Sequence, residues 1–285
     1  MMRVHILPMT LALSLLTACD IGSEAATEAS FTFQTIELVW QGGTNCKEGV
    51  DGDEVTTTSD VEAPLCATVS FSYPELSSEA KPEAAAAINA LIREELLDQA
   101  EQSSTQSPPT TQAALKSFAD DFIQAFVQEK NAFTDWNVER SASLVYASDS
   151  LLTVLFEESG YTGGAHPYSG ARYLVLDAQN GEVLHLADLL NNGYAASLNI
   201  EGEKAFREAR GLTDASSLDE AGFIFDNNVF ALNNNFGVTQ EGLVFYFNSY
   251  EIAPYAMGPT QIQIPFEDFQ SLIRPDGPLS SQLDS

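Results

Sequence analysis

The stretch "ARYLVLDAQNGEVLHL", residues 171–186, carries the strongest short-range signal for the fold. It places Asn180 and Gly181 between two runs of β-forming residues. Asn-Gly favours the tight turn whose backbone twist matches that of two paired strands, so the stretch predicts a hairpin. The residues on either side of this hairpin indicate the other elements of the fold.

Further strand patterns precede the hairpin. Residues 136–148 and 151–164 are both β-rich and are separated by two turn-forming residues, which predicts a second hairpin. Residues 31–40 and 65–76 have alternating or β-rich patterns. They predict two more strands, joined by an irregular loop.

Between these strands the apolar residues change to a helical period. One helix is predicted from near Pro82, and a second from apolar residues over 115–126. Such apolar stripes are typical of helices that pack on a core. Farther along, residues 186–190 and 199–210 predict short helices, and residues 242–273 predict two strands around a Pro- and Tyr-containing loop, then a closing helix.

Strands grouped with strands, and helices with helices, predict an α+β fold rather than a doubly wound parallel sheet. We expect mixed or antiparallel sheets with packed amphipathic helices. The globular part divides into two sequential subdomains, an N-terminal half over residues 31–150 and a C-terminal domain over residues 151–275. A polar tail at 276–285 follows.

The N-terminal residues indicate where the chain resides. The apolar run Ile6–Leu16 is too short to span a bilayer as a helix. The Leu-Thr-Ala-Cys at its end resembles a bacterial lipobox, so residues 1–18 are predicted to be a lipoprotein signal peptide and Cys19 to be lipidated. Residues 19–30 form a polar tether. We expect a lipid-anchored protein of the bacterial cell envelope that faces the periplasm or the outside. Both the inner and the outer membrane stay open as the site of the anchor.

Two further cysteines, Cys46 and Cys66, would enter an oxidising compartment. With Cys19 acylated only one pairing is possible, and we expect a disulfide, which would contribute on the order of 3 kcal/mol by closing a loop of about 20 residues. The alternatives are free thiols or half of a metal site. No other Cys or His lies nearby in the sequence to complete such a site.

The chain is strongly acidic, with 41 Asp and Glu against 12 Lys and Arg and a net charge of −29. This charge repels phosphates and anionic lipid headgroups, so we expect no nucleic-acid partner and contact with a membrane only through the lipid anchor. It favours a cationic partner. The alternative is that the acidity only keeps an exported protein soluble.

The loop "SGYTGGAHPYSG", residues 159–170, contains His166, one of three histidines. The sequence lacks the motifs that would support a catalytic role for this loop. It has neither a Gly-x-Ser-x-Gly nucleophile motif nor a His-Glu-x-x-His zinc motif. A zinc site of His166, His185 and one carboxylate stays open. So does a wall-modifying hydrolase that uses His166 with an acid such as Glu158. We expect no catalytic residues, no metal and no other cofactor.

The same loop can instead serve to hold a shape. Gly163 and Gly164 permit positive φ and close backbone approach, and a proline directly after the histidine restricts the chain. A rigid loop of this kind presents Tyr161, His166 and Tyr168 to a ligand. The alternative is a structural histidine whose ring only holds the loop in place.

Two segments carry a family resemblance. They are "ESGYTGGAHPYSGARYLVLDAQNGEVLHLADLL" at 158–190 and "GLVFYFNSYEIAPYAMGPTQIQIPFEDF" at 242–269. Together they resemble the extracellular domain of the anti-sigma factor RsiV, a module also found beside the deacetylase module of PdaC-type peptidoglycan deacetylases. The resemblance is good over residues 150–275 and looser over residues 31–150.

The resemblance implies binding rather than catalysis. In RsiV the domain binds lysozyme outside the cell and thereby licenses proteolysis of the anti-sigma factor, while in the deacetylases a separate module is catalytic. We find neither that catalytic sequence nor the transmembrane and sigma-binding parts of RsiV in this sequence. The implied partner is a lysozyme-like protein or a peptidoglycan fragment.

Charge and aromatic residues agree with such a role. C-type lysozyme is strongly cationic, so attraction to this anionic chain would speed their encounter. Two tyrosines in a Pro- and Gly-constrained loop can anchor a partner, although tyrosines beside a strand end also pack as structural corners. We expect a monomeric, non-catalytic lipoprotein, and the alternative is a structural lipoprotein without a specific ligand. The predicted ligand-binding residues are Tyr161, Gly163, Gly164, His166, Tyr168, Tyr250 and Tyr255.

Overall fold

A computed structural model describes residues 31–44, 46, 65–98, 112–130 and 132–283. The predicted signal peptide, the predicted lipidation site at Cys19 and the predicted tether all fall on residues outside the described ones. No helix in the described part of the chain has the length and apolar character needed to cross a membrane.

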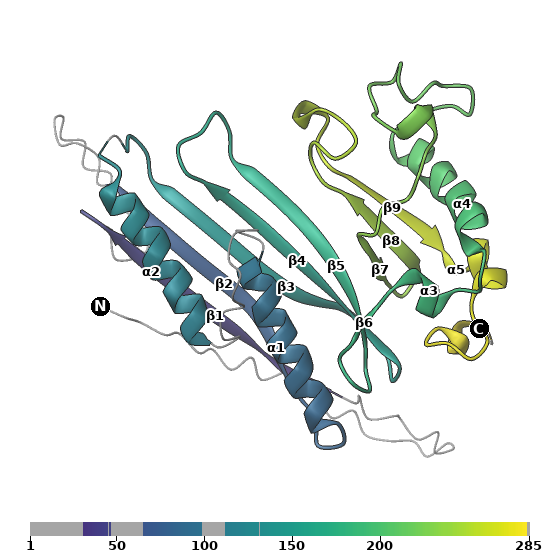
Figure 1. Ribbon diagram of the computed structural model, residues 1–285, viewed down its shortest axis with the longest axis horizontal. Coiled ribbons are helices and arrows are strands. Elements are labelled where there is room, and N and C mark those ends of the chain that lie inside the picture. Colours follow the sequence, from purple (N-terminus) through teal and green to yellow (C-terminus); the bar gives the residue numbers. More distant parts are fainter. Residues whose placement is uncertain (1–30, 45, 47–64, 99–111, 131, 284–285) are drawn as a thin grey trace, which may run out of the picture.

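A six-stranded sheet is the larger part of the fold (Figure 1). Its strands follow the order of the chain, and all neighbours are antiparallel except the second and third, which are parallel. The strands are β1 (Thr32–Gly43), β2 (Cys66–Ser77), β3 (Trp136–Ala147), β4 (Leu151–Tyr161), β5 (Tyr168–Asp177) and β6 (Val183–Leu184).

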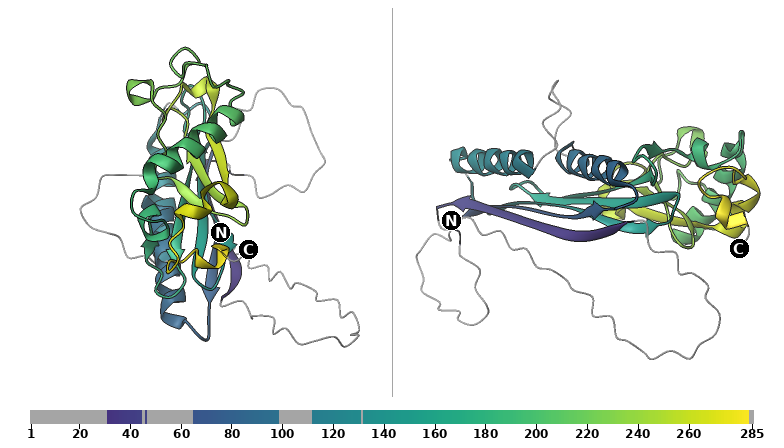
Figure 2. Two further views of the ribbon diagram at one scale, coloured as in Figure 1. Left: turned by 90° about the vertical axis from the view of Figure 1, so that its right-hand side faces the viewer. Right: turned by 90° about the horizontal axis from the view of Figure 1, so that it is seen from below.

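Two helices, α1 (Pro82–Asp98) and α2 (Gln112–Gln128), form the crossover that the parallel pair β2 and β3 requires. Both lie on one face of the sheet (Figure 2). Their apolar stripes pack on alternate residues of the strands, so that Ile88, Leu115 and Phe71 share one core. The two predicted helices are therefore confirmed, as is the α+β class.

The C-terminal part builds a second, antiparallel sheet of three strands with its own core. Phe206 is fully buried there, with its ring centroid 4.9 Å from that of Phe223 and 5.2 Å from that of Phe230. The elements of this part are β7 (Phe236–Val238), β8 (Gly242–Phe247), β9 (Thr260–Pro265), α3 (Leu186–Leu189), α4 (Tyr194–Ala209), α5 (Phe266–Phe269) and the 3-10 turns η1 (Asp226–Asn228), η2 (Tyr255–Met257), η3 (Gln270–Leu272) and η4 (Ser280–Leu283).

The hairpin around Asn180-Gly181 forms, and Gly181 adopts a φ of 79° in its turn. Its second strand has only 2 residues, because α3 begins directly afterwards. The closing helix is also short, with one turn in α5 followed by η3. The larger sheet continues past residue 150, the predicted boundary between the two subdomains, since β3 and β4 are paired neighbours.

Cys46 and Cys66 form a disulfide with a Cα–Cα distance of 5.1 Å. The predicted pairing is thereby confirmed. The bond attaches Cys46, which follows the end of β1, to the first residue of β2. The backbone N–H of Cys66 also donates to the carboxylate of Asp135, at 2.7 Å, just before β3. This end of the sheet is therefore held by a covalent bond and a polar contact.

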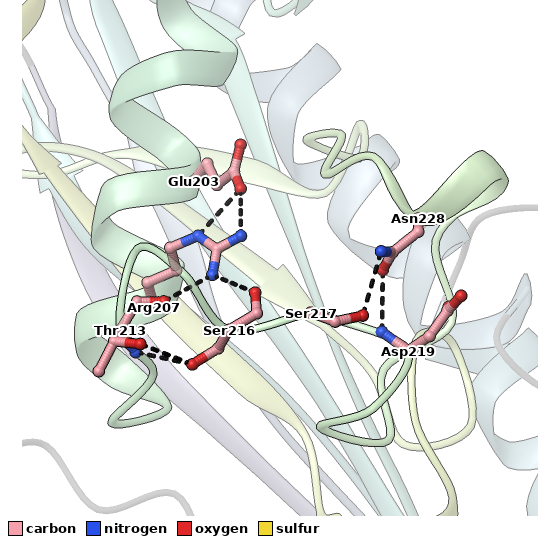
Figure 3. Close-up of polar contacts among 7 residues, drawn as sticks. All are labelled: Glu203, Arg207, Thr213, Ser216, Ser217, Asp219 and Asn228. Atoms are coloured by element: carbon pink, nitrogen blue, oxygen red, sulfur yellow. Dashed lines mark hydrogen bonds and ion pairs between the residues drawn. The ribbon is translucent and has the colours of Figure 1, made fainter.

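The irregular segment between α4 and β7 is held by side chains rather than by secondary structure (Figure 3). Arg207 donates to the carboxylate of Glu203 at 2.9 and 2.7 Å and to the carbonyls of Thr213 and Ser216, both at 2.9 Å. Asn228 accepts from the backbone N–H of Asp219 at 2.9 Å. These contacts fix the turns that carry the buried phenylalanines into the C-terminal core.

Candidate binding site at the junction of the two sheets

Three aromatic side chains from two distant loops meet at one end of the larger sheet. His166 lies in the β4–β5 loop (residues 162–167), and Tyr250 and Tyr255 lie in the β8–β9 loop (residues 248–259). The rings of His166 and Tyr255 are stacked, with centroids 3.9 Å apart and an interplanar angle of 15°. The rings of Tyr250 and Tyr255 are 5.5 Å apart. We call these three residues the aromatic cluster.

Hydrogen bonds fix the tautomer of His166 within the aromatic cluster. Its Nδ1 lies 2.9 Å from the carbonyl oxygen of Pro167, which can only accept, so Nδ1 carries the proton. In the neutral ring Nε2 then accepts from the hydroxyl of Tyr250, 3.2 Å away. The hydroxyl of Tyr255 donates to the same Pro167 carbonyl at 3.0 Å. Tyr255 thus holds the two loops together, as the structural alternative for this tyrosine supposed.

Tyr250 is the part of the cluster that a partner can reach. Its side chain is 64% exposed, and its backbone has a φ of 70°, a left-handed conformation that bulky residues rarely adopt. Strained backbone of this kind persists where surrounding contacts enforce it, and it is concentrated at binding and catalytic sites. Tyr250 thus combines an exposed ring with a strained backbone.

Two asparagines attach the second sheet to the edge of β5 and so position the β8–β9 loop. The side-chain amide of Asn248 accepts from the N–H of Ala171 at 2.8 Å and donates to its carbonyl at 3.0 Å. Asn235 accepts from the N–H of Tyr173 at 2.8 Å. These amides take the place of a neighbouring strand. The sequence gives no signal for them, because asparagine in a loop usually predicts only a turn.

The other predicted site residues do not join the cluster. The hydroxyl of Tyr161 donates to the carbonyl of Gly164 at 2.8 Å, within the same loop. Gly163 has a φ of 88° as the turn requires, whereas Gly164 is not among the residues with positive φ. Tyr168 is paired with Gly160, and its ring covers that glycine on the helix-covered face of the sheet. Tyr168 therefore lies apart from the cluster.

A buried ion pair on that face was not anticipated from the sequence. Arg140 is 1% exposed and donates from Nε to Glu158 at 2.7 Å. Its Nη1 donates to the carbonyls of Leu96 and Leu97 at the end of α1, at 2.6 and 3.2 Å. The guanidinium lies over the ring of Phe118 in α2, 4.4 Å from its centroid. Arg140 thus joins two strands to both helices.

Burial raises the pKa of the Glu158 carboxyl above its ordinary value, although the charge of Arg140 and its hydrogen bond act to lower it. The folded state then holds this proton more tightly than the unfolded state, so the stability that Glu158 contributes falls as the pH rises through the interval between the two pKa values. The uncharged Gln of Glu158→Gln has no such dependence. We therefore expect the free energy of unfolding of the wild type to fall relative to that of the variant from about pH 4 to pH 7.

Urea denaturation of both proteins across this range measures the difference. A difference that moves the other way, in favour of the wild type as the pH rises, would show that the attraction of Arg140 outweighs burial.

The residues named in the catalytic alternatives make other contacts. Glu158 binds Arg140 on the helix-covered face, while His166 is stacked on Tyr255 at the junction of the sheets. His185 precedes α3, and its backbone N–H donates to the carboxylate of Asp188 at 2.8 Å. Within the described ranges, no three His, Cys, Asp or Glu side chains gather as a metal site.

Two protein families match the chain. The family described as "Deacetylase PdaC" matches residues 62–169, and the one described as "Protein of unknown function (DUF3298)" matches residues 187–267. The first covers β2 to the start of β5, and the second covers α3 to α5. A search of curated proteins found no match.

Solved structures agree with the family matches. A member of the DUF3298 family from Bacteroides fragilis is 19% identical, with a TM-score of 0.65 over 90% of this chain and 98% of its own. A DUF3298 family protein from Pseudomonas aeruginosa is also 19% identical, with a TM-score of 0.56 over 86% of this chain and 95% of its own. At this identity the likeness shows the fold.

The fold and the family matches define an α+β protein of two joined domains. The chain combines a PdaC domain, over residues 62–169, with an RsiV-like DUF3298 domain, over residues 187–267. The predicted resemblance is thereby confirmed. The aromatic cluster lies where the two domains meet, since His166 belongs to the first and Tyr250 to the second.

Proposed function

We propose that this protein is a non-catalytic binding module of the bacterial cell envelope that recognises a lysozyme-like, cationic, wall-degrading enzyme through the aromatic cluster. The observation that carries the proposal is the exposed Tyr250, held in a left-handed conformation beside His166 and Tyr255. Aromatic rings on a fixed backbone lose little entropy on binding and are frequent interface anchors.

Charge supports the same kind of partner. The chain has a net charge of −29, which would attract a cationic enzyme and raise its rate of association. Among the described Lys and Arg side chains, Arg140 is buried in an ion pair and Arg207 is tied to Glu203. An anionic wall polymer would meet repulsion instead.

The direction of the chain supports a lipid anchor that leaves the cluster accessible. β1 begins at Thr32, which pairs with Ser77, whereas the β4–β5 loop lies at the opposite end of the sheet. A strand of 12 residues spans about 40 Å. Lipidation at Cys19 would therefore anchor the chain through the segment that enters the sheet at the end far from the aromatic cluster.

Calorimetric titration of the purified protein with a C-type lysozyme tests the proposal, with a mixture of muropeptides as a parallel titrant. We expect stoichiometric binding of the lysozyme at moderate salt. Heat from the muropeptides alone would assign the cluster to a wall component instead. Turnover of the muropeptides that is lost in His166→Ala would favour the hydrolase alternative and contradict a non-catalytic role.

A further inference from the structure

A second aromatic surface adjoins the β4–β5 loop at Gly163. Gly163 lies between Phe133 and Trp136, and a Cβ built on this glycine would be 3.7 Å from Cζ of Phe133 and 3.7 Å from Nε1 of Trp136. Phe133 is 76% exposed, which makes it the most exposed large apolar side chain among the described residues. Its position beside the candidate site needs an explanation.

The backbone around Phe133 is held in place. The next residue but one, Asp135, accepts from the N–H of Cys66 at 2.7 Å, and Cys66 is itself in the disulfide. Trp136 packs against α2, with its ring 6.0 Å from Phe122 and 5.6 Å from Phe126. Phe133 is therefore presented from a supported segment, like Tyr250. Aromatic residues, Phe included, are enriched at the cores of protein interfaces.

Each of the two anchors belongs to a different domain. Phe133 lies within residues 62–169, which match the PdaC family, and Tyr250 lies within residues 187–267, which match the DUF3298 family. The β4–β5 loop lies near Phe133 at Gly163 and contacts Tyr250 at His166. A partner that covers this loop would touch both domains at once.

The neighbouring sheet face has the charge that a cationic partner requires. The strand register places Glu139 beside Ser70 and Ser159. In the adjacent row it places Glu37 on β1 and Glu157 on β4, with β2 and β3 between them. The three glutamates are exposed on the face of β1–β4 that is opposite α1 and α2 (Figure 2). These two rows contain no Lys or Arg across β1 to β4. The local charge thus agrees with the net charge of the chain.

We propose that Phe133 is a second anchor for the same cationic protein, which therefore binds across both domains rather than to the DUF3298 domain alone. This inference rests on the proposed function, because it names a further contact for the partner of the aromatic cluster. The ring of Phe133 is buried on binding, and the acidic sheet face accelerates the encounter.

Titration of the full protein with a C-type lysozyme, at the same moderate salt for every variant, tests this. Phe133→Ala is expected to weaken the affinity about 10-fold. The matched control is Phe33→Ala, which removes another ring, 58% exposed, from β1 at the other end of the sheet. The control is expected to bind like the wild type. Circular dichroism of both variants verifies that they are folded.

The outcomes separate the two proposals. If Phe133→Ala binds like the wild type while Tyr250→Ala loses affinity, the second anchor is wrong and the proposed function stands. If Phe33→Ala weakens binding as much as Phe133→Ala, the loss is not specific to this surface and the second anchor is also wrong. If the wild type does not bind the lysozyme, the proposed function fails, and the second anchor fails with it.

Discussion

Replacing Arg140 with alanine is expected to lower the free energy of unfolding by about 3–5 kcal/mol, the range found when one partner of a buried ion pair is removed. Glu158 would lose its counter-charge while only 13% of its side chain is exposed. The carbonyls of Leu96 and Leu97 would lose their shared donor. Urea denaturation at neutral pH measures the loss.

Arg172→Ala is the matched control for Arg140→Ala. Arg172 pairs with Glu95 at the same distance, 2.7 Å, but half of its side chain is exposed, so we expect a loss below about 1 kcal/mol. The double variant Arg140→Met with Glu158→Leu removes both charges and should lose less than Arg140→Ala alone. Equal losses for Arg140→Ala and Arg172→Ala would contradict the role given to the buried pair.

Replacing Tyr250 is expected to have the largest effect on binding. Truncation of an interface anchor costs about 2 kcal/mol or more, which is about 30-fold in affinity. Tyr250→Ala and Tyr250→Gly should therefore both lose affinity for the lysozyme by this amount. Calorimetry at moderate salt measures it.

The same two variants should differ in stability, because a φ of 70° strains alanine but not glycine. We expect Tyr250→Gly to unfold with a free energy about 1 kcal/mol higher than that of Tyr250→Ala. If Tyr250 had only a structural role, replacing it would not both relieve backbone strain and weaken binding of the lysozyme. If both variants bind like the wild type, Tyr250 is not part of the interface. If the two variants are equally stable, the backbone at residue 250 is not strained.

Local patterns in the sequence were sufficient for much of the fold. The Asn180-Gly181 hairpin, the helix that begins at Pro82 and the Cys46–Cys66 disulfide each depend on residues close together in the chain or on a single possible pairing. The position of the boundary between the two domains is harder to predict from local patterns than the individual elements are. A hairpin turn looks the same within a sheet as between two domains, and β3 and β4 turned out to be neighbours in one sheet.

The site was only partly predictable because it depends on contacts across the chain. His166 and Tyr250 are 84 residues apart in sequence, and no local sequence pattern predicts the hydrogen bond between them. Arg140 occupies an alternating strand pattern that gives no sign of a buried guanidinium. Tyr168 was grouped with Tyr161, but the pairing of Tyr168 with Gly160 places it on the other face. The strand register, which depends on the length and shape of the β4–β5 loop, decides such questions.

The most direct test of the central claim compares the wild type with Tyr250→Ala in calorimetric titrations against a C-type lysozyme at low and at moderate salt. We predict stoichiometric binding by the wild type that weakens only modestly with salt. Binding by Tyr250→Ala should be about 30-fold weaker at moderate salt and should depend more strongly on salt, because charge attraction is least screened at low salt. Wild-type binding that vanishes at moderate salt, or no binding at either salt, would contradict recognition by the aromatic cluster.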